Sequence, residues 1–286
     1  MTKMNKILKS LLSVAVISAS LASCSQVDSI SEIELEEKKT NTTITLNLHS
    51  DWPQTTTVVF ATNTMGSFDK AFYHKGNAME VPVGKYKFYA VNRNRSYEYE
   101  NLNFDKLSKD TTLYYGNVLI ASKTNEYTTS DEGVQKVLSG KYVSRNAGEI
   151  FADSTMLVNV GLGQNVNVTF QKPYKLTTQY TISGSFTSSR AAQSIYLEIC
   201  DIVAKKRPNG TAVAGKKAKC VFAIGGAAKD TKKEFEQTMT VLGVPQKGTA
   251  NIYVRFKGDE KSTTPEQKSV QYTVSDGIIK LGDITF

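Results

Sequence analysis

Apolar and polar residues alternate along most of the chain after residue 41. Ile44, Leu46 and Leu48 form one apolar row, separated by Thr45 and Asn47. A period of two places alternate side chains on opposite faces, which is typical of a half-buried β-strand. No helical stripe competes with this pattern, so an all-β fold is predicted. The alternation recurs in Tyr86/Phe88/Ala90, Val166/Val168/Phe170, Ile195/Leu197/Ile199, Ile252/Val254/Phe256 and Val270/Tyr272/Val274.

Turn residues separate these rows. Pro82-Val83-Gly84, Pro208-Asn209-Gly210 and Asp276-Gly277 each interrupt the alternation. The last leaves two residues between its strands, which favours a type I′ hairpin. Short antiparallel strands with frequent turns predict β-sandwiches. The least regular stretch, residues 117–154, is expected to be a long loop with a helical turn.

A break in the strand pattern near Lys172-Pro173-Tyr174 divides the chain after residue 41 into two parts. Proline interrupts the strand pattern there, and a new alternation begins at Thr178. We therefore expect one β-sandwich domain in residues 42–172 and a second in residues 173–286. Basic residues concentrate in the second, which has 17 Lys and Arg against 10 Asp and Glu.

The first residues have the composition of a secretory signal. Lys3, Lys6 and Lys9 precede a short apolar run that ends in Leu21-Ala22-Ser23-Cys24. This ending resembles the lipobox of bacterial lipoproteins, which implies that residues 1–23 are removed and that Cys24 is acylated. Ser25 after the cysteine then favours the outer membrane. The alternative is a free cysteine beside an ordinary signal.

Residues 24–41 form an acidic segment between the signal and the first strand. They contain no Gly, Pro or aromatic residue, and Ile30, Ile33 and Leu35 alternate in part with glutamates. The segment is either a spacer below the folded body or, in its second half, an additional edge strand.

Signals for catalysis are weak. The two histidines are His49 and His74, and no nucleophile elbow, zincin motif or Cys-x-x-Cys pair is present. A partial phosphate-binding motif begins at Gly210 but has Lys217 where Ser or Thr must ligate magnesium. We expect a protein that is not an enzyme and that needs no cofactor or metal.

Two groups of charged residues are expected to be solvated. Asp131 and Glu132 are adjacent and are interpreted as loop charges. The second group is six cations, with no acid among them, that flank the Asn209-Gly210 turn. They are expected either to protect a strand edge from aggregation or to attract an acidic partner. No aromatic residue is interleaved with them, which argues against nucleic acid. These cations are Lys205, Lys206, Arg207, Lys216, Lys217 and Lys219.

Two cysteines remain after lipidation, Cys200 and Cys220. A two-residue loop at Asn209-Gly210 would place Cys200 opposite Lys219, with Cys220 on the other face. A three-residue loop or a bulge would bring the two sulfurs together as a disulfide. Both arrangements remain open from the sequence.

Trp52 is the single tryptophan and lies at the end of the first strand. It either closes the end of a sandwich or provides a ligand contact as a platform for stacking a sugar ring. Tyr97 and Tyr99 are further candidate aromatic contacts for a glycan.

Several short motifs resemble a family. They are Leu46-Asn47-Leu48-His49-Ser50-Asp51-Trp52, Val81-Pro82-Val83-Gly84-Lys85-Tyr86 leading into Phe88-Tyr89-Ala90-Val91-Asn92, Tyr114-Tyr115-Gly116, and Tyr180-Thr181-Ile182-Ser183-Gly184 after Pro173 and Tyr174. In this order they resemble the fimbrillin-associated lipoproteins that anchor type V fimbriae. The resemblance implies two tandem transthyretin-like β-sandwich domains, a structural role in a surface filament, and neither cofactor nor catalytic residues.

The resemblance also bears on processing. Polymerising subunits of this family lose their first strand by cleavage after an arginine, and the vacated groove accepts a strand from the next subunit. The first arginine here is Arg93, although Lys38-Lys39 would suit a lysine-specific enzyme. A subunit that keeps both lipid and first strand suits an anchor better than a shaft.

These observations favour one function and leave a second open. The favoured one is an outer-membrane lipoprotein, exposed at the cell surface, that anchors or assembles fimbriae by β-strand pairing with a fimbrial subunit. The alternative is a surface lipoprotein that binds glycans or adheres without a fimbrial role.

Overall fold

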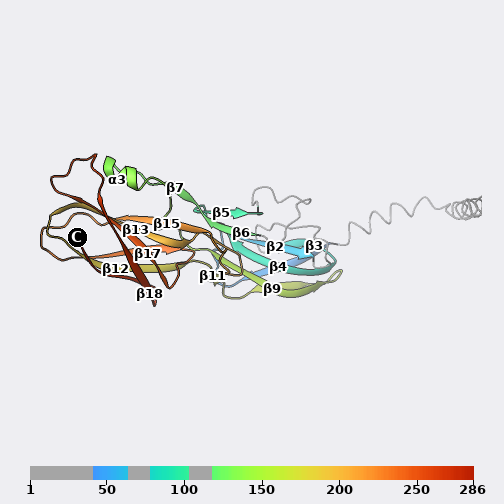
Figure 1. Cartoon of the computed structure of the whole chain (residues 1–286). Helices are drawn as coiled ribbons and strands as arrows, with labels where there is room; N and C mark the ends of the chain where they lie inside the picture. The colour runs from blue at the N-terminus through green and yellow to red at the C-terminus, as the bar shows by residue number, and fades with distance from the viewer. Residues whose placement is uncertain (1–40, 64–77, 103–117) are drawn as a thin grey trace, which may run out of the picture.

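The computed structural model describes residues 41–63, 78–102 and 118–286. Two lobes lie end to end, and each is built almost entirely of β-strands (Figure 1). Outside the described residues lie the predicted signal peptide, Cys24, nearly all of the acidic segment, His74 and Tyr114-Tyr115-Gly116. The expectations about them remain predictions.

The N-terminal lobe consists of two sheets that enclose an apolar core. One sheet has the order β10-β1-β3 and the other β11-β9-β4-β2. Ile44, Phe88 and Phe170 are fully buried between them, as the alternation predicts. The strands are β1 (Asn41–Leu48), β2 (Thr57–Asn63), β3 (Ala78–Pro82), β4 (Gly84–Asn92), β9 (Phe151–Val160), β10 (Val166–Phe170) and β11 (Tyr174–Lys175).

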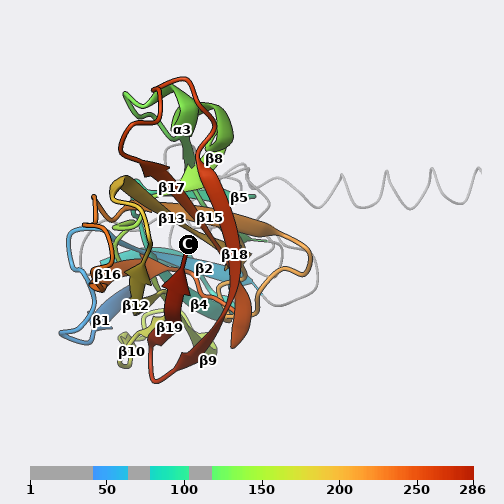
Figure 2. The ribbon, with the colours of Figure 1, turned by 60° about the vertical axis from the view of Figure 1, so that its left-hand side comes forward.

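The C-terminal lobe is one seven-stranded sheet with the order β15-β13-β17-β18-β19-β12-β16, which closes over a single apolar core (Figure 2). Leu197, Ile252 and Ile279 are buried in this core. The strands are β12 (Thr178–Thr187), β13 (Ala192–Val203), β15 (Lys217–Ala223), β16 (Lys233–Val241), β17 (Lys247–Phe256), β18 (Glu266–Ser275) and β19 (Ile278–Thr285).

The turn predictions are confirmed at two positions. Asp276 and Gly277 join β18 to β19 with φ angles of 51° and 75°. Positive φ at both central residues defines the predicted type I′ turn. Val83 separates β3 from β4. The turn at Asn209-Gly210, in contrast, does not make a two-residue hairpin, because β13 ends at Val203 and β15 begins only at Lys217.

A small sheet of order β14-β6-β5 connects the lobes. It joins β5 (Tyr97–Glu100) and β6 (Leu119–Ser122) to β14 (Lys205–Lys206) from the C-terminal half. An apolar cluster beneath it contains Ile120 together with Leu176 and Leu242. Contacts therefore cross the expected boundary at residue 172, and the division into residues 42–172 and 173–286 remains our proposal.

A second connection between the lobes is a segment that we call the strap, residues 124–146. It contains β7 (Thr124–Glu126), α3 (Glu132–Val137) and β8 (Lys141–Val143). The sequence predicted a loop with a helical turn here. The helical turn is confirmed, but the strap packs against the outer face of the C-terminal sheet (Figure 1). Val134 and Leu138 are fully buried there against Tyr196 and Tyr253.

Asp131 fixes α3 to the C-terminal lobe. Its carboxylate caps the helix by accepting from the Val134 amide at 3.1 Å. The same carboxylate accepts from Arg255 Nε at 2.5 Å and from a terminal guanidinium nitrogen at 2.7 Å. Arg255 is 1% exposed, and it also donates to the carbonyls of Glu260, Lys261 and Thr263. The interpretation of Asp131 as a solvated loop charge is therefore wrong.

Gly133 permits this close approach. A Cβ atom at this position would lie 2.1 Å from the Thr263 carbonyl oxygen and 2.2 Å from the Arg255 guanidinium. The glycine amide donates to the Lys261 carbonyl at 2.7 Å. The first turn of α3 can therefore contact the loop after β17 only because no side chain stands between them.

No helix among the described residues is long and apolar enough to cross a membrane.

Replacing Asp131 tests whether the ion pair holds the strap. Asp131→Asn keeps a helix-capping side chain but leaves the buried Arg255 charge without its carboxylate. We expect the free energy of unfolding to fall by about 3 kcal/mol, the range for breaking a buried pair. Urea denaturation measures it. The neighbouring exposed Glu132→Gln is the control, and equal stability of both variants would contradict the role of the pair.

Candidate functional site

A buried carboxylate lies under the strap on the outer face of the C-terminal sheet. Glu198, on β13, is 1% exposed. It accepts hydrogen bonds from Asn251 at 2.6 Å, Lys219 at 2.9 Å, Tyr142 at 3.1 Å and Tyr253 at 3.2 Å. Tyr142 comes from β8 of the strap, whereas the other three donors belong to the sheet.

The protonation of this cluster is set by its hydrogen bonds. Burial alone raises the pKa of the Glu198 carboxyl, but the donors Asn251, Lys219 and Tyr142 outweigh it and hold the pKa below its ordinary value. Desolvation opposes the charge of Lys219, yet its contact with Glu198 raises the pKa of that amine. Both groups are thus held charged, which makes Lys219 a structural cation rather than a nucleophile.

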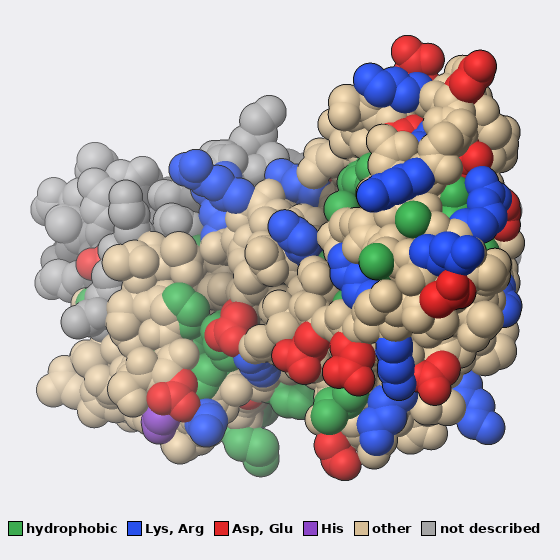
Figure 3. Space-filling view, turned by 90° about the vertical axis from the view of Figure 1, so that its left-hand side faces the viewer, with side chains coloured by type: hydrophobic (Ala, Val, Ile, Leu, Met, Phe, Trp, Pro, Cys, Tyr) green, Lys and Arg blue, Asp and Glu red, His purple; other side chains and the backbone are tan. Residues whose placement is uncertain are grey.

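Three of the six cations in the predicted basic cluster pair with acids from elsewhere in the chain. Lys205 pairs with Glu100, and Lys217 pairs with Asp201 at 2.6 Å. Lys206 donates to the Leu176 carbonyl at 2.9 Å, and burial lowers the pKa of its amine. The prediction that the whole cluster is solvated is therefore wrong. Positive and negative side chains are interspersed on the end of the C-terminal lobe (Figure 3).

Cys200 and Cys220 are free thiols, so the disulfide that the sequence left open is not formed. Cys220 pairs with Ile199 in the ladder and points into the core, where burial raises its pKa to about 12. A register shift follows in β13, and Cys200 lies on the opposite face beside Glu198. Burial, with the Glu198 charge, raises the pKa of Cys200 to about 12. The bulge that was considered is present, but it leaves the sulfurs on different faces.

The proposed aromatic ligand contacts are not available. Trp52 is 2% exposed, its indole N–H donates to the Gln171 carbonyl at 3.0 Å, and its ring packs edge-on against Phe170. It closes the end of the sandwich, and the alternative of a sugar platform is wrong. Tyr97 is also buried, donating to the Gly148 carbonyl, and Tyr99 is half-buried with its hydroxyl bonded to the Asn92 carbonyl.

His49 is the one histidine that the structure describes. It lies at the end of β1 with Nδ1 3.6 Å from the Asp51 carboxylate, which also lies 3.5 Å from Lys172. In the described part of the chain, no Ser, Thr or Cys donates a hydrogen bond to His49, and no group of three His, Cys, Asp or Glu residues could hold a metal. The arrangement lacks a nucleophile for hydrolytic chemistry.

The candidate binding site is the edge of the C-terminal sheet formed by β16. This strand pairs with β12 over nine consecutive residues without a register shift, and its other side carries no further strand among those described. Glu234, Glu236 and Thr238 are exposed along it.

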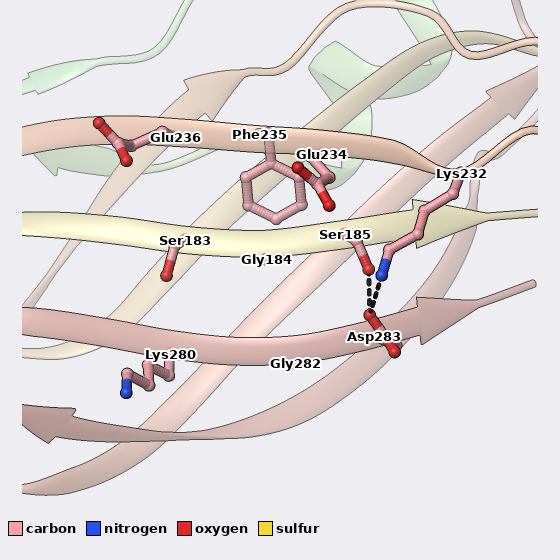
Figure 4. A pocket seen from close by; sticks show the side chains of 10 residues that line it. All are labelled: Ser183, Gly184, Ser185, Lys232, Glu234, Phe235, Glu236, Lys280, Gly282 and Asp283. Carbon is pink, nitrogen blue, oxygen red and sulfur yellow. Dashed lines mark hydrogen bonds and ion pairs between the residues drawn. The ribbon is translucent and has the colours of Figure 1, made fainter.

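A trough of about 540 Å³ runs beside this edge, on the outer face of β16, β12 and β19 (Figure 4). The short side chains of Ser183 and Ser185, with Gly184 between them, form its floor. Glu234 and Glu236 line one side. On the other, Asp283 accepts from Ser185 and pairs with Lys232 at 3.2 Å. The Phe235 ring also lines the trough, so a shallow surface with both polar and apolar contacts results, which suits recognition.

Residue pattern alone did not identify this edge. The alternation identified strands, but only the sheet order shows that β16 is terminal. The single available signal was the run of Glu234 and Glu236 on a strand without proline.

Comparisons place the fold among known structures. No family model and no curated protein matches the sequence. The solved structure of a candidate adhesin from Bacteroides ovatus is similar with a TM-score of 0.53 and 14% identity, over 87% of this chain and 86% of that chain. This likeness shows a shared fold.

Two further similar structures have TM-scores below 0.5 and carry no argument about this chain. The fimbrial anchor protein Mfa2 from Porphyromonas gingivalis has a TM-score of 0.43 and 12% identity, over 74% of this chain and 77% of that chain. A protein described as polysaccharide binding, from Bacteroides thetaiotaomicron, has a TM-score of 0.41 and 12% identity, over 83% and 77%.

The Glu198 cluster predicts a specific dependence on pH. Because its folded pKa lies below the ordinary value of 4.5, the ionised carboxylate stabilises the fold above that pH, and this contribution is lost as the pH falls through the lowered pKa. We expect Glu198→Gln to reduce the free energy of unfolding by about 2 kcal/mol at pH 7 and by less at pH 3. Urea unfolding at both pH values, with exposed Glu236→Gln as control, measures it. An equal loss at both pH values would contradict the assignment.

Thiol labelling tests the state of the cysteines. In a protein of residues 25–286, we expect Cys200 and Cys220 to resist iodoacetamide in the native state. Raised pKa values keep both thiols protonated, and Cys220 is also buried in the core. In denaturant without reductant, both should be alkylated. Intact mass spectrometry counts the labels. Alkylation only after reduction would instead establish a disulfide.

Proposed function

We propose that this chain is a non-catalytic lipoprotein of the outer membrane, anchored by acylated Cys24, that anchors or assembles surface fimbriae by pairing a β-strand with a fimbrial subunit. The single observation that carries the proposal is the open edge of β16, since unpaired backbone groups on a sheet edge are a template for a strand from another chain.

Two further observations support a surface role. The fold is shared with a protein described as a candidate adhesin. In addition, the buried charged groups Glu198 and Arg255 are engaged in structural contacts between the strap and the sheet. A scaffold of this kind can hold a partner without performing chemistry on it.

The position of β1 supports an anchor rather than a shaft subunit. This strand lies at the centre of its sheet, parallel to β10 and antiparallel to β3. Its removal would expose both neighbours and the apolar row that contains Ile44. Since Arg93 is the first arginine, cleavage after an arginine cannot release β1 alone. We infer that β1 stays in place and that the mature chain begins at Cys24.

A second candidate function is glycan binding. The polar trough over Ser183 and Ser185 supports it, because hydroxyls and carboxylates are suitable hydrogen-bond partners for sugar hydroxyls. Of the aromatic candidates for this role, Trp52 and Tyr97 are buried, and Tyr99 is half-buried with its hydroxyl bonded to the Asn92 carbonyl. A glycan would therefore bind by hydrogen bonds without ring stacking.

Cross-linking in cells tests the leading proposal. Cells that produce the native lipidated protein are treated with a mild cross-linker, and the covalently joined proteins are captured and identified by mass spectrometry. We expect a fimbrial subunit linked through its terminal strand, because strand pairing brings the two backbones into contact.

Cells with Cys24→Ala provide the control for anchoring. We expect this variant to be lost from the outer-membrane fraction and filaments to be released into the medium. Recovery of the wild-type protein alone, with filaments unaffected by its deletion, would overturn the proposal. Specific retention on a glycan array, lost in a Ser183→Asp variant, would then support the second function.

A further inference from the structure

The direction of the backbone groups on β16 follows from one hydrogen bond to the strap. The Thr240 amide donates away from β12, to the Arg145 carbonyl of the strap at 2.8 Å. In an antiparallel ladder, alternate residues direct both backbone groups to the same side. Glu234, Glu236 and Thr238 therefore present their N–H and C=O groups to the open side. The structure gives these groups no partner among the residues it describes.

No lysine, proline or register shift occurs in residues 234–238 of β16, whose charged side chains are Glu234 and Glu236. The opposite edge, β15, carries Lys217 and Lys219, and its pairing with β13 contains a register shift. In β16 the pairing is regular, and proline is absent. Its one cation, Lys233, turns back to donate to the Gly226 carbonyl at 2.5 Å. The strap covers the edge at Thr240 and leaves residues 234–238 open.

The charge on this open segment is negative. Glu234 and Glu236 are exposed, lie two residues apart on the outer face, and make no ion pair within the described residues. The nearest paired acid, Asp283, is already neutralised by Lys232. A strand added to β16 would place its own side chains directly opposite these two carboxylates.

The trough provides space for long side chains beside the two acids. Ser183 and Ser185 are the cross-strand neighbours of Glu236 and Glu234, and they are short. The stem of an incoming Lys or Arg can lie over this floor while its charged end meets a carboxylate. Asp or Glu at the same positions would face like charge.

We infer that β16 is the docking edge of the protein and that its occupant is an extended segment of another protein with Lys or Arg at two alternate positions. This inference rests on the proposed function, because it gives the proposed strand pairing a location and a partner chemistry.

Peptide binding to a soluble form of the protein, residues 25–286, tests the inference. The probe is a fluorescent peptide as long as β16, with Lys at two alternate positions among Thr and Val, and a second peptide has Glu in place of both Lys. We expect the Lys peptide to bind and the Glu peptide not to bind. The double variant Glu234→Lys/Glu236→Lys should weaken the Lys peptide at least about fivefold and should bind the Glu peptide.

Two matched controls separate a specific edge from general electrostatics. Glu98→Lys/Glu126→Lys makes the same change of charge at exposed positions on β5 and β7 and should leave binding unchanged. Thr238→Pro removes an open-side N–H and should weaken binding, whereas Thr238→Val keeps that N–H and should not. Thermal unfolding verifies that each variant is folded. If Thr238→Pro is unfolded, the comparison of Glu234→Lys/Glu236→Lys with Glu98→Lys/Glu126→Lys still tests the inference.

Three outcomes would overturn the inference. In the first, the Glu234→Lys/Glu236→Lys variant binds the Lys peptide as well as the wild type does. In the second, the Glu98→Lys/Glu126→Lys control loses as much affinity for that peptide. In the third, the wild type self-associates and Thr238→Pro abolishes this, which would make a second copy of the chain the occupant. Cross-linking distinguishes this inference from the proposed function. A fimbrial subunit joined at another edge would refute only the inference, whereas peptide binding at β16 without any fimbrial subunit would refute only the proposed function.

Discussion

The structure depends on the requirement that buried charges have partners. The outer face of the C-terminal sheet carries Glu198 and Arg255, both 1% exposed. An unpaired charge in that position would be strongly unfavourable. The strap supplies Asp131 to the arginine and the Tyr142 hydroxyl to the glutamate. The sheet therefore needs the strap, and the strap in turn fastens the N-terminal half of the chain to the C-terminal lobe.

The same requirement redistributes the charge of the molecule. The basic residues around the Asn209-Gly210 turn have no acid near them in sequence, yet Glu100, Asp201 and Glu198 neutralise three of them in space. The charges left unpaired for binding a partner are therefore not the ones that the basic run in the sequence suggests. Negative charge stays unpaired at Glu234 and Glu236, in a half of the chain that is basic overall.

The two edges of the C-terminal sheet are not equivalent. Lysines and a bulge occur at the β15 edge, where β8 also packs against the lobe. The β16 edge is regular, and within the described residues the strap bonds to it at Thr240. The proposed addition of a strand would therefore take place at the β16 edge, whereas the β15 edge resists uncontrolled addition. This asymmetry agrees with a protein that receives one partner rather than one that polymerises with itself.

The sequence by itself determined the strands and their faces. The rows around Ile44, Phe88 and Leu197 are buried as predicted, and the Asp276-Gly277 turn has the predicted conformation, because alternation and turn chemistry are local properties of the chain. Only the tertiary structure decided which polar positions are buried. Glu198 and Arg255 alternate with apolar residues as solvent-facing positions do, and their burial depends on the strap, which is distant in sequence. The free cysteines, the buried Trp52 and the open edge of β16 were likewise fixed by sheet order and register, which arise from contacts between segments far apart in the chain.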